Sequence, residues 1–355
     1  MSSLLWPLLG LCALWMALRY LPAGWDWHRP LPELIALVPF LSAPIMIVLA
    51  WALVVAAWPQ AVAATLLLTL EAVWALPFLL HLPKPLLALS ALPASAQPGP
   101  SAPAGTADPD DPAASLTLMT LNCKYGHADA KAIVSAVRQR GVDLLALQEV
   151  STGLLERLHA NGLDALLPYG VSGPATRDDN GGFNALFCAI DPRESSPQSV
   201  PLPASAVPTM TLPALGGSIV AASAHPKSPQ RGGANWGSSI QALAGLSPAA
   251  PSTPARASAR RLAGQADEAI IMGDLNSSLF HPSFRRLLAD GRLLDGAVAL
   301  HRGLYPTFPA SYPIVPPMIE IDHVLLTPGL SIQSLHAFHI PSTDHQALLA
   351  KIVAS

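Results

Sequence analysis

The sequence has few charged residues and few cysteines. Lysine, arginine, aspartate and glutamate together make up only 12% of its 355 residues, while 51% are hydrophobic. An ordinary soluble chain is about one quarter charged. The three cysteines show neither a CxxC motif nor a Cys/His ligand spacing, which argues against a zinc site or a disulfide framework. We expect Cys123 and Cys188 to be buried free thiols, with a single bridge between them as the alternative.

The apolar excess lies at the N-terminal end of the chain. Three apolar runs precede residue 84, and we predict membrane spans at residues 4–22, 35–58 and 61–82. The second and third runs exceed the roughly 20 residues that a membrane-spanning helix needs, with the predicted turn at Trp58–Gln60. The first run lacks the charged start and the cleavage site of a signal peptide. Residues 1–84 are therefore expected to form a three-helix transmembrane region.

The composition changes twice more along the chain. Residues 85–115 are mainly Pro, Ala, Ser and Gly, which is typical of a linker. Residues 116–355 are long enough for one sizeable α/β domain. Three of the 20 basic and six of the 23 acidic residues precede this domain, which leaves it 17 of each. Nucleic acid is a possible but disfavoured partner, because non-specific DNA binding depends on lysine and arginine.

Polar side chains stand where the expected strands of this domain end. The stretches "SLTLMTLNCKYG", "VDLLALQEVS" and "GSIVAASAHPKSP" are apolar strands that end at Asn122, at Gln148–Glu149 and at His225. Between the first two, "DAKAIVSAVRQRG" has apolar residues at helical spacing and a glycine stop. The later stretches "IEIDHVLL" and "IPSTDHQALLAKI" carry the pairs Asp322–His323 and Asp344–His345. In α/β folds, ligand sites gather at such strand ends.

The stretch "EAIIMGDLNSS", residues 268–278, places two more polar residues at a strand end. Residues at positions i and i+2 of an extended chain point the same way. Asp274 and Asn276 are therefore predicted to face one site. A plain turn is the alternative, since glycine, aspartate and asparagine all favour turns.

These polar positions form one ordered set: Asn122, Gln148–Glu149, His225, Gly273–Asn276, Asp322–His323 and Thr343–His345. In this order, the set resembles the motifs of the endonuclease/exonuclease/phosphatase superfamily. The resemblance covers essentially all of residues 116–355. A three-span anchor is similar to that of the membrane-bound bacterial branch, which includes teicoplanin-resistance-type phosphatases acting on polyprenyl pyrophosphates. The resemblance implies an α/β fold in which two packed mixed β-sheets with helices on both outer faces form a four-layer sandwich, preceded by the transmembrane region.

The residue types indicate how a phosphate ester would be cleaved. Cleavage requires that charge on the phosphoryl oxygens is neutralised and that a water is activated. Mg²⁺ or Mn²⁺ takes hard oxygen ligands, and Glu149 is the first candidate ligand, with Asp344 and Asn122 beside it. Glu149 and Asp344 also have structural interpretations: Glu149 would cap a following helix, and Asp344 would be a turn residue.

The remaining candidates serve the attacking water and the phosphoryl group. A general base near neutral pKa suits histidine, and His345 is that candidate, oriented by Asp322 as the resemblance implies. Asp274 would position or help to deprotonate the water. Asn276 and His225 are the expected hydrogen-bond donors to the phosphoryl oxygens. His323 is expected to pack structurally.

One position departs from the family pattern. After the strand "GGFNALFCAI", many members of the family place a serine and an arginine near the site, whereas Cys188–Ala189 stand there in this sequence. A basic phosphate contact is therefore missing from that position. Asn184 is predicted to replace it weakly as a substrate-binding residue.

These features predict a membrane-anchored, divalent-metal-dependent phosphohydrolase that cleaves a phosphate ester or pyrophosphate of a small molecule or a lipid carrier. The alternatives are a membrane-associated nuclease or other phosphodiesterase of the same fold, and a catalytically inactive membrane-anchored binding module. Arg19, Arg29 and Lys84 would share one face with the domain, and the positive-inside rule then favours the cytoplasm. The exported character of the linker and the resemblance favour the outer face. We predict a multi-pass cell-membrane protein with an extracytoplasmic catalytic domain.

Overall fold

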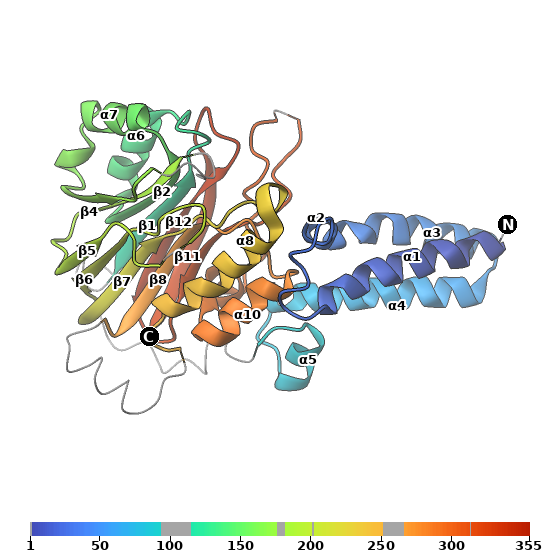
Figure 1. The fold of residues 1–355 in the computed structure, drawn as a ribbon. Coiled ribbons are helices and arrows are strands. Elements are labelled where there is room, and N and C mark those ends of the chain that lie inside the picture. The colour runs from blue at the N-terminus through green and yellow to red at the C-terminus, as the bar shows by residue number, and fades with distance from the viewer. Residues whose placement is uncertain (1, 94–114, 176–181, 201, 251–265, 313) are drawn as a thin grey trace.

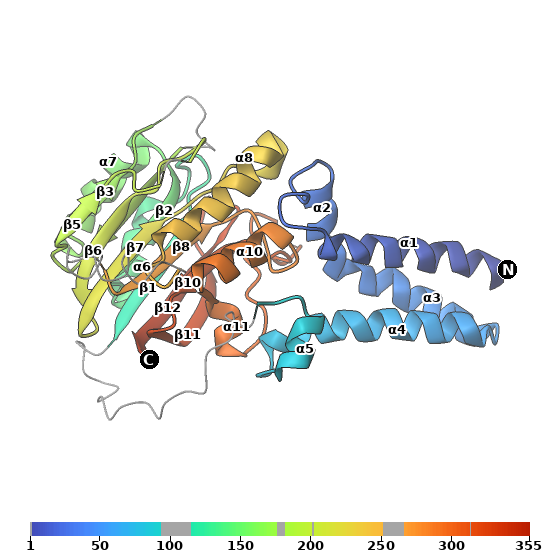
Figure 2. The same cartoon turned by 60° about the horizontal axis from the view of Figure 1, so that its bottom comes forward.

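The computed structural model describes residues 2–93, 115–175, 182–200, 202–250, 266–312 and 314–355. A helical bundle at the N-terminal end projects from an α/β domain (Figures 1 and 2). Most of the predicted linker lies outside the described residues.

Three apolar helices form the bundle. They are α1 (Leu5–Ala17), α3 (Ser42–Val54) and α4 (Trp58–Ala75), extended by the 3-10 segments η1 (Ser2–Leu4), η2 (Leu18–Tyr20), η3 (Val38–Leu41) and η4 (Leu76–Phe78). Small and medium side chains such as Leu9, Ile45 and Ala64 pack in its interior. Its outer surface is apolar as well: Ile47 is 71% exposed and Val54 79%.

The structure differs from the predicted spans in length and boundaries. In the described part of the chain, one helix is long and apolar enough to cross a membrane, Trp58–Phe78, and the apolar helices Leu5–Tyr20 and Val38–Val54 are shorter. The run at 35–58 is broken because its start belongs to a separate short helix, α2 (Leu31–Ala36). The predicted turn at Trp58–Gln60 is wrong: Trp58 begins α4, whose early proline the first helical turn tolerates.

Two six-stranded mixed sheets make up the α/β domain. The first has the order β11-β12-β1-β2-β4-β3 and the second β5-β6-β7-β8-β10-β9, with parallel pairs β1/β2 and β7/β8. The strands of the first are β1 (Leu116–Asn122), β2 (Leu144–Val150), β3 (Tyr169–Ser172), β4 (Phe183–Cys188), β11 (Leu330–His339) and β12 (Gln346–Ala354). Those of the second are β5 (Glu194–Ser196), β6 (Thr209–Ala214), β7 (Gly217–Ser223), β8 (Glu268–Asp274), β9 (Leu294–Asp295) and β10 (Asp322–Leu326).

Helices cover the outer face of each sheet, which confirms the sandwich. The helices α6 (Ala130–Arg140) and α7 (Thr152–Ala160) lie on the first sheet, and α8 (Pro229–Ala242) and α10 (Pro282–Gly291) lie on the second (Figure 1). Successive side chains of β1 point to opposite faces of its sheet. Leu118 therefore packs in the core between the two sheets, while Met119 and Leu121 pack under α6 and α7. Smaller elements are α5 (Lys84–Leu89), α11 (Gly296–Leu300), η7 (Leu163–Ala165) and η8 (Leu243–Leu246).

Two expectations about individual segments have clear outcomes. The first residues of the predicted linker form α5, and Leu87 and Leu92 join the core of the α/β domain. Cys123 and Cys188 are both free and buried, which confirms the prediction of buried free thiols. Their burial raises the pKa of each thiol.

Candidate active site

The polar strand ends of the two sheets meet at one edge of the sandwich. Parallel strands β1 and β2 end there with Asn122 and Glu149, and β7 and β8 end there with His225 and Asp274. The antiparallel strand β10 starts at the same edge, so that Asp322 stands directly opposite Asp274. The carboxyl ends of parallel neighbours share an edge within each sheet. The packing of the two sheets brings the two edges together, with Asn122 in contact with Asp274 and His225 close to Glu149.

Two local irregularities aim the acidic side chains. The pairing of β2 with β4 shifts between Leu147 and Val150, and Glu149 has φ +52° inside this bulge. Bulges of this kind redirect a side chain. In β8, a Cβ on Gly273 would lie 2.0 Å from the carbonyl oxygen of Ala224. Only glycine fits there, and the close approach of the two strands sets Asp274 in place.

Asp274 is the centre of the site. Its Oδ2 accepts a hydrogen bond from Asn122 Nδ2 at 2.9 Å and lies 3.4 Å from His225 Nε2 and 3.7 Å from His345 Nε2. Its Oδ1 accepts the backbone N–H of Asn276 at 2.8 Å. Burial acts to raise the pKa of Asp274, but His345 and His225 outweigh it and hold the pKa well below its usual range. The carboxylate is therefore charged at neutral pH.

His345 forms a buried pair with Asp322. Its Nδ1 lies 2.8 Å from Asp322 Oδ2, and the ring of Phe308 packs against the imidazole at 5.0 Å between centroids. Burial lowers the pKa of His345, but the carboxylates of Asp322 and Asp274 outweigh burial and raise it to about 10. The two carboxylates thus favour the protonated form of the imidazole. The general-base role of His345 stays a prediction.

The predicted metal ligands lie around the same centre, with one difference. Glu149 Oε1 accepts from Asn122 Nδ2 at 3.2 Å, and Asp344 Oδ2 lies 3.4 Å from Lys124 Nζ. The Oδ1 of Asn122 accepts the backbone N–H of Lys124 at 2.9 Å. The amide of Asn122 thus turns its nitrogen to the carboxylates and orients them, instead of offering the ligand oxygen that we predicted.

The donor set fits a hard divalent cation. The carboxylates of Glu149, Asp274, Asp322 and Asp344 gather beside Lys124, Arg231 and the imidazolium of His345, which leaves an excess of negative charge. One oxygen of Asp322, Oδ1, is buried without a hydrogen-bond partner. Oxygen atoms of Asp274 and Asp322 lie within 4.8 Å of each other and of a ring nitrogen of His345, which offers no lone pair to a cation while it is protonated. Magnesium and manganese favour such oxygen-rich surroundings.

A pocket of about 400 Å³ opens above these groups. Glu149, His225, Asp274, Asn276, Asp344 and His345 all line it. Asn276 reaches the pocket through a turn, because its backbone has φ +49° and its Nδ2 donates to the carbonyl of Pro226 at 3.2 Å. The predicted convergence of Asp274 and Asn276 on one site is therefore present, although Asn276 lies in a turn rather than on the continued strand.

The structure corrects the prediction for Asn184. Its side chain is fully buried, and its Nδ2 donates to the carbonyl oxygen of Ala206 at 2.9 Å. It does not line the pocket. The neighbouring Ser205 hydroxyl donates to the carbonyl oxygen of His225, so the side chain of Asn184 is turned toward the segment that holds His225 and away from the pocket.

Sequence reasoning missed two basic residues of the pocket. Lys124 and Arg231 both line it, and the guanidinium of Arg231 donates to the hydroxyl of Tyr125 and lies over its ring. Lys124 follows the strand-end residue Asn122 by two positions. This position in the sequence could have identified Lys124, because a basic residue next to a strand-end site can bind an anion there.

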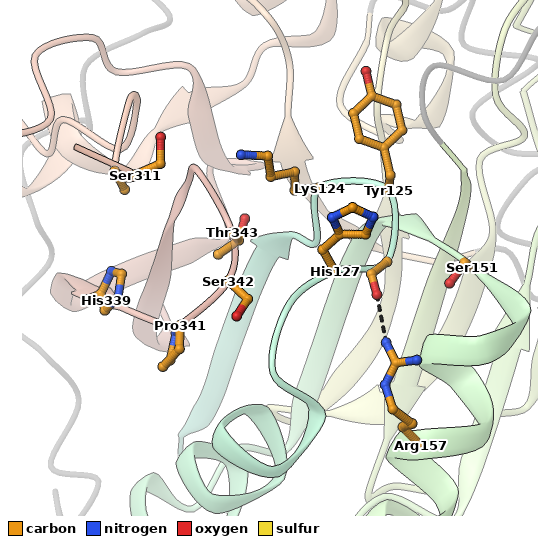
Figure 3. A pocket seen from close by; sticks show the side chains of 12 residues that line it. Lys124, Tyr125, His127, Ser151, Arg157, Ser311, His339, Pro341, Ser342 and Thr343 are labelled. Atoms are coloured by element: carbon orange, nitrogen blue, oxygen red, sulfur yellow. Dashed lines mark hydrogen bonds between the residues drawn. The ribbon is translucent and has the colours of Figure 1, made fainter. Parts of the chain in front are cut away.

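A second, polar cavity of about 880 Å³ adjoins the pocket (Figure 3). The two share Lys124 and Tyr125. The basic side chains on its lining are Lys124, His127, Arg157 and His339, and Arg157 is held by a 2.7 Å hydrogen bond to the carbonyl of Gly126. It holds none of the gathered carboxylates, and the chemistry therefore belongs to the smaller pocket.

His323 is structural, as expected. Its Nδ1 lies 2.7 Å from Asp295 Oδ2 and its Nε2 lies 2.9 Å from the carbonyl oxygen of Ser277. Burial lowers the pKa of His323, but Asp295 outweighs burial and raises it to about 9.

A raised histidine pKa makes stability depend on pH. The unfolded histidine titrates near 6.5, so the stabilisation by protonated His323 is complete below that pH and is lost as pH rises through about 9. Each pKa unit corresponds to about 1.4 kcal/mol, which gives a loss on the order of 3 kcal/mol. As the pH is raised from about 6.5 to about 9, we expect the melting temperature of the full chain in detergent to decrease. We expect the decrease to be smaller in His323→Gln. An equal fall in the variant would contradict the assignment.

Comparisons with known proteins identify the family and the fold. Residues 119–345 match the model of the "Endonuclease/Exonuclease/phosphatase family". An endonuclease/exonuclease/phosphatase from Beutenbergia cavernae is 19% identical, with a TM-score of 0.50 over 68% of this chain and 72% of that one. A humanised TDP2 from D. rerio is 12% identical, with a TM-score of 0.50 over 67% and 98%. These likenesses show the fold. The comparison with curated proteins found no match.

Proposed function

Because the chain belongs to the endonuclease/exonuclease/phosphatase family, whose members are hydrolases acting on phosphate esters, we propose that it is a membrane-anchored, divalent-metal-dependent phosphohydrolase. Its substrate is a phosphate ester or pyrophosphate of a small molecule or a lipid. The observation that carries this proposal is the contact of Asp274 with Asn122, His225 and His345 beside Glu149.

Each residue of the site has a part in the proposed reaction. Asp274, charged and hydrogen-bonded by Asn122, orients the attacking water and accepts its proton as the new phosphorus–oxygen bond forms and the bond to the leaving oxygen breaks. His345, held by Asp322, donates a hydrogen bond to the phosphoryl group as negative charge grows on its oxygens. His225 and Asn276 bind the same oxygens. Such donors act most strongly in a partly buried site that excludes water.

A divalent cation would be held by Glu149 and Asp344, with Asp274 within reach. When bound, it supplies neutralisation of the phosphoryl charge and polarisation of the phosphorus–oxygen bond. Asn122 keeps the two carboxylates of Glu149 and Asp274 oriented toward the pocket. This division differs from the predicted ligand set only in the role of Asn122.

The helical bundle is the proposed anchor. Its apolar outer surface supports this, because a soluble bundle would place polar side chains there. The helix Trp58–Phe78 is long enough to span a bilayer. Leu5–Tyr20 and Val38–Val54 would span with it, since flanking residues and local thinning of the bilayer accommodate a short helix.

Hydrolysis assays of the purified full chain test the function. With Mg²⁺ present, we compare a polyprenyl pyrophosphate, a phospholipid, a nucleotide and duplex DNA. Release of phosphate from a lipid or a small ester supports the proposal. Preference for DNA would make the chain a nuclease, which its equal numbers of acidic and basic residues in the domain disfavour. Hydrolysis of none of them would favour the inactive binding module.

The side of the membrane has a separate test. We propose that the catalytic domain lies outside the cytoplasm, and a reporter fused after Gly105 distinguishes the two sides. Alkaline phosphatase folds only after export, so this fusion is expected to be active, while a reporter that folds only in the cytoplasm is expected to be silent at the same position. The reverse pattern would place the domain in the cytoplasm, as the positive-inside rule suggests.

A further inference from the structure

The exposed large apolar side chains of the catalytic domain gather near the helical bundle. Among the described residues from 116 onward they are Tyr125, Leu304, Tyr312, Ile314, Val315 and Met318. Tyr125 lines the catalytic pocket, and Leu304 lines a cavity beside α4. The other four form a set that we call the apolar loop, in which Ile314 is 91% exposed. Apolar exposure confined to one region marks an interaction surface.

The apolar loop rises directly from the catalytic pocket. Phe308 precedes it and Ile319 follows it, and these two residues are joined by reciprocal backbone hydrogen bonds of 3.0 and 2.8 Å. Both line the pocket. The base of the loop is therefore fixed at the pocket wall while its side chains project outward. In Figure 1 the loop is the brown segment near α2, at the end of the domain that meets the bundle.

Another wall of the same pocket comes from the anchor itself. Residues of α2, which lies between the first two bundle helices, line the pocket: Pro32, Glu33 and Ala36. The carbonyl oxygen of Pro32 lies 3.0 Å from His281 Nε2. The buried carboxylate of Asp26 accepts hydrogen bonds from the backbone N–H and the hydroxyl of Ser283, at 2.8 and 2.6 Å. These contacts fix α2 to α10.

A close backbone contact fixes the same segment to α8. A Cβ on Gly233 would lie 1.9 Å from the carbonyl oxygen of Trp27, and a Cβ on Gly237 would lie 2.5 Å from the Trp27 ring. The chain between α1 and α3 thus packs closely against two glycines of the catalytic domain. The segment between α1 and α3 is therefore packed directly against the domain, and the pocket lies where the bundle joins the domain.

We infer that the apolar loop is a second membrane contact, which enters the boundary between lipid headgroups and acyl chains beside the bundle. The inference rests on the proposed function, in which the bundle is the anchor. A bilayer is the occupant that the structure favours, because the base of the loop lines the same pocket as α2, next to the apolar bundle, and the domain is otherwise poor in exposed large apolar side chains. The pocket then opens on the membrane surface, where Lys124 and Arg231 meet the phosphate of a bilayer lipid.

The position of the loop is tested with a fluorescent probe on the full chain. All three natural cysteines are buried, so Ile314→Cys takes an environment-sensitive label at one site. In vesicles of equal parts phosphatidylcholine and phosphatidylglycerol, its emission is expected to shift to shorter wavelength and to be quenched by lipids with spin-labelled acyl chains. The control is Ser195→Cys on the exposed strand β5, whose emission should stay as in water.

An activity measurement gives the second readout. The double variant Ile314→Glu/Met318→Glu is expected to lower kcat/KM about tenfold for a phosphomonoester lipid embedded in vesicles, since buried apolar area drives interfacial binding. It should leave hydrolysis of water-soluble p-nitrophenyl phosphate unchanged. The matched control Ser195→Glu/Gln198→Glu adds the same charges on exposed residues of β5 and the turn after it, and should change neither rate.

The outcomes separate the two proposals. A water-like, unquenched probe at residue 314 in a protein that has inserted through its bundle would overturn the inference and leave the proposed function standing. Equal loss of activity on the soluble ester would also overturn it, because it would show damage to the fold. Absence of hydrolysis on every substrate would refute the proposed function, while the probe would still decide whether the loop contacts lipid. Failure of the chain to insert into vesicles would remove both the anchor and the loop contact.

Discussion

Removal of divalent metal ions is expected to abolish phosphate release by the full chain, and added Mg²⁺ or Mn²⁺ to restore it. The site gathers the carboxylates of Glu149, Asp274, Asp322 and Asp344 beside Lys124, Arg231 and the imidazolium of His345, and phosphate in the substrate adds further negative charge. Without a cation, substrate and site repel each other, so we expect a loss of at least about a thousandfold, the scale of losing electrostatic stabilisation of the transition state. Hydrolysis is measured after exhaustive dialysis against EDTA and again after the metal is returned.

A variant separates metal binding from damage to the protein. Glu149→Gln keeps the shape of the side chain and removes its charge, and is expected to weaken Mg²⁺ binding at least about tenfold in calorimetry, because hard cations depend on carboxylate ligands. The control is Glu156→Gln, an exposed residue of α7, which should bind Mg²⁺ as the unaltered protein does. Full hydrolysis after chelation, or unchanged binding in Glu149→Gln, would contradict the assignment.

The sandwich and most of its site follow from a pattern that is local in the sequence. Each strand is an apolar run that stops at a polar residue, and β1/β2 and β7/β8 are parallel pairs. Parallel neighbours must end at one edge, so Asn122 and Glu149 meet in the first sheet and His225 and Asp274 meet in the second. The packing of the two sheets then brings these pairs into contact. Side-chain alternation along β1 also set which residues face the second sheet and which face the helices.

What the sequence could not predict depends on contacts between distant segments. The hydropathy of residues 35–58 predicted one span. Hydropathy carries no information on the contacts of Trp27 and Asp26 with the catalytic domain, which hold α2 there as a separate helix. The inward direction of Asn184 depends on a partner, Ala206, that lies 22 residues away. The role of Asn122 depends on which end of its amide meets Glu149. None of these features leaves a periodic signal.

Replacing either member of the central histidine–aspartate contact is expected to slow turnover by at least about a hundredfold. Asp274→Asn removes the charge that orients and deprotonates water, and His345→Gln removes the proton donor that Asp322 holds in place. Both replacements are close in size to the native side chains, so the buried site keeps its packing. Single-turnover hydrolysis of the same substrate measures the chemical step, and thermal melting in detergent confirms that each variant is folded.

A surface pair of the same chemistry provides the control. His159 Nδ1 lies 2.7 Å from Asp164 Oδ1, the geometry of the His345–Asp322 pair but exposed to solvent, and His159→Gln should leave turnover within about twofold, since exposed pairs contribute little. If Asp322 acts only through His345, the double variant Asp322→Asn/His345→Gln will be no slower than His345→Gln alone, because residues that work as a unit are not additive. Losses that multiply would show that Asp322 acts independently, for which its unpaired buried oxygen offers a route through the metal. Near-normal turnover in both Asp274→Asn and His345→Gln would end the proposed mechanism.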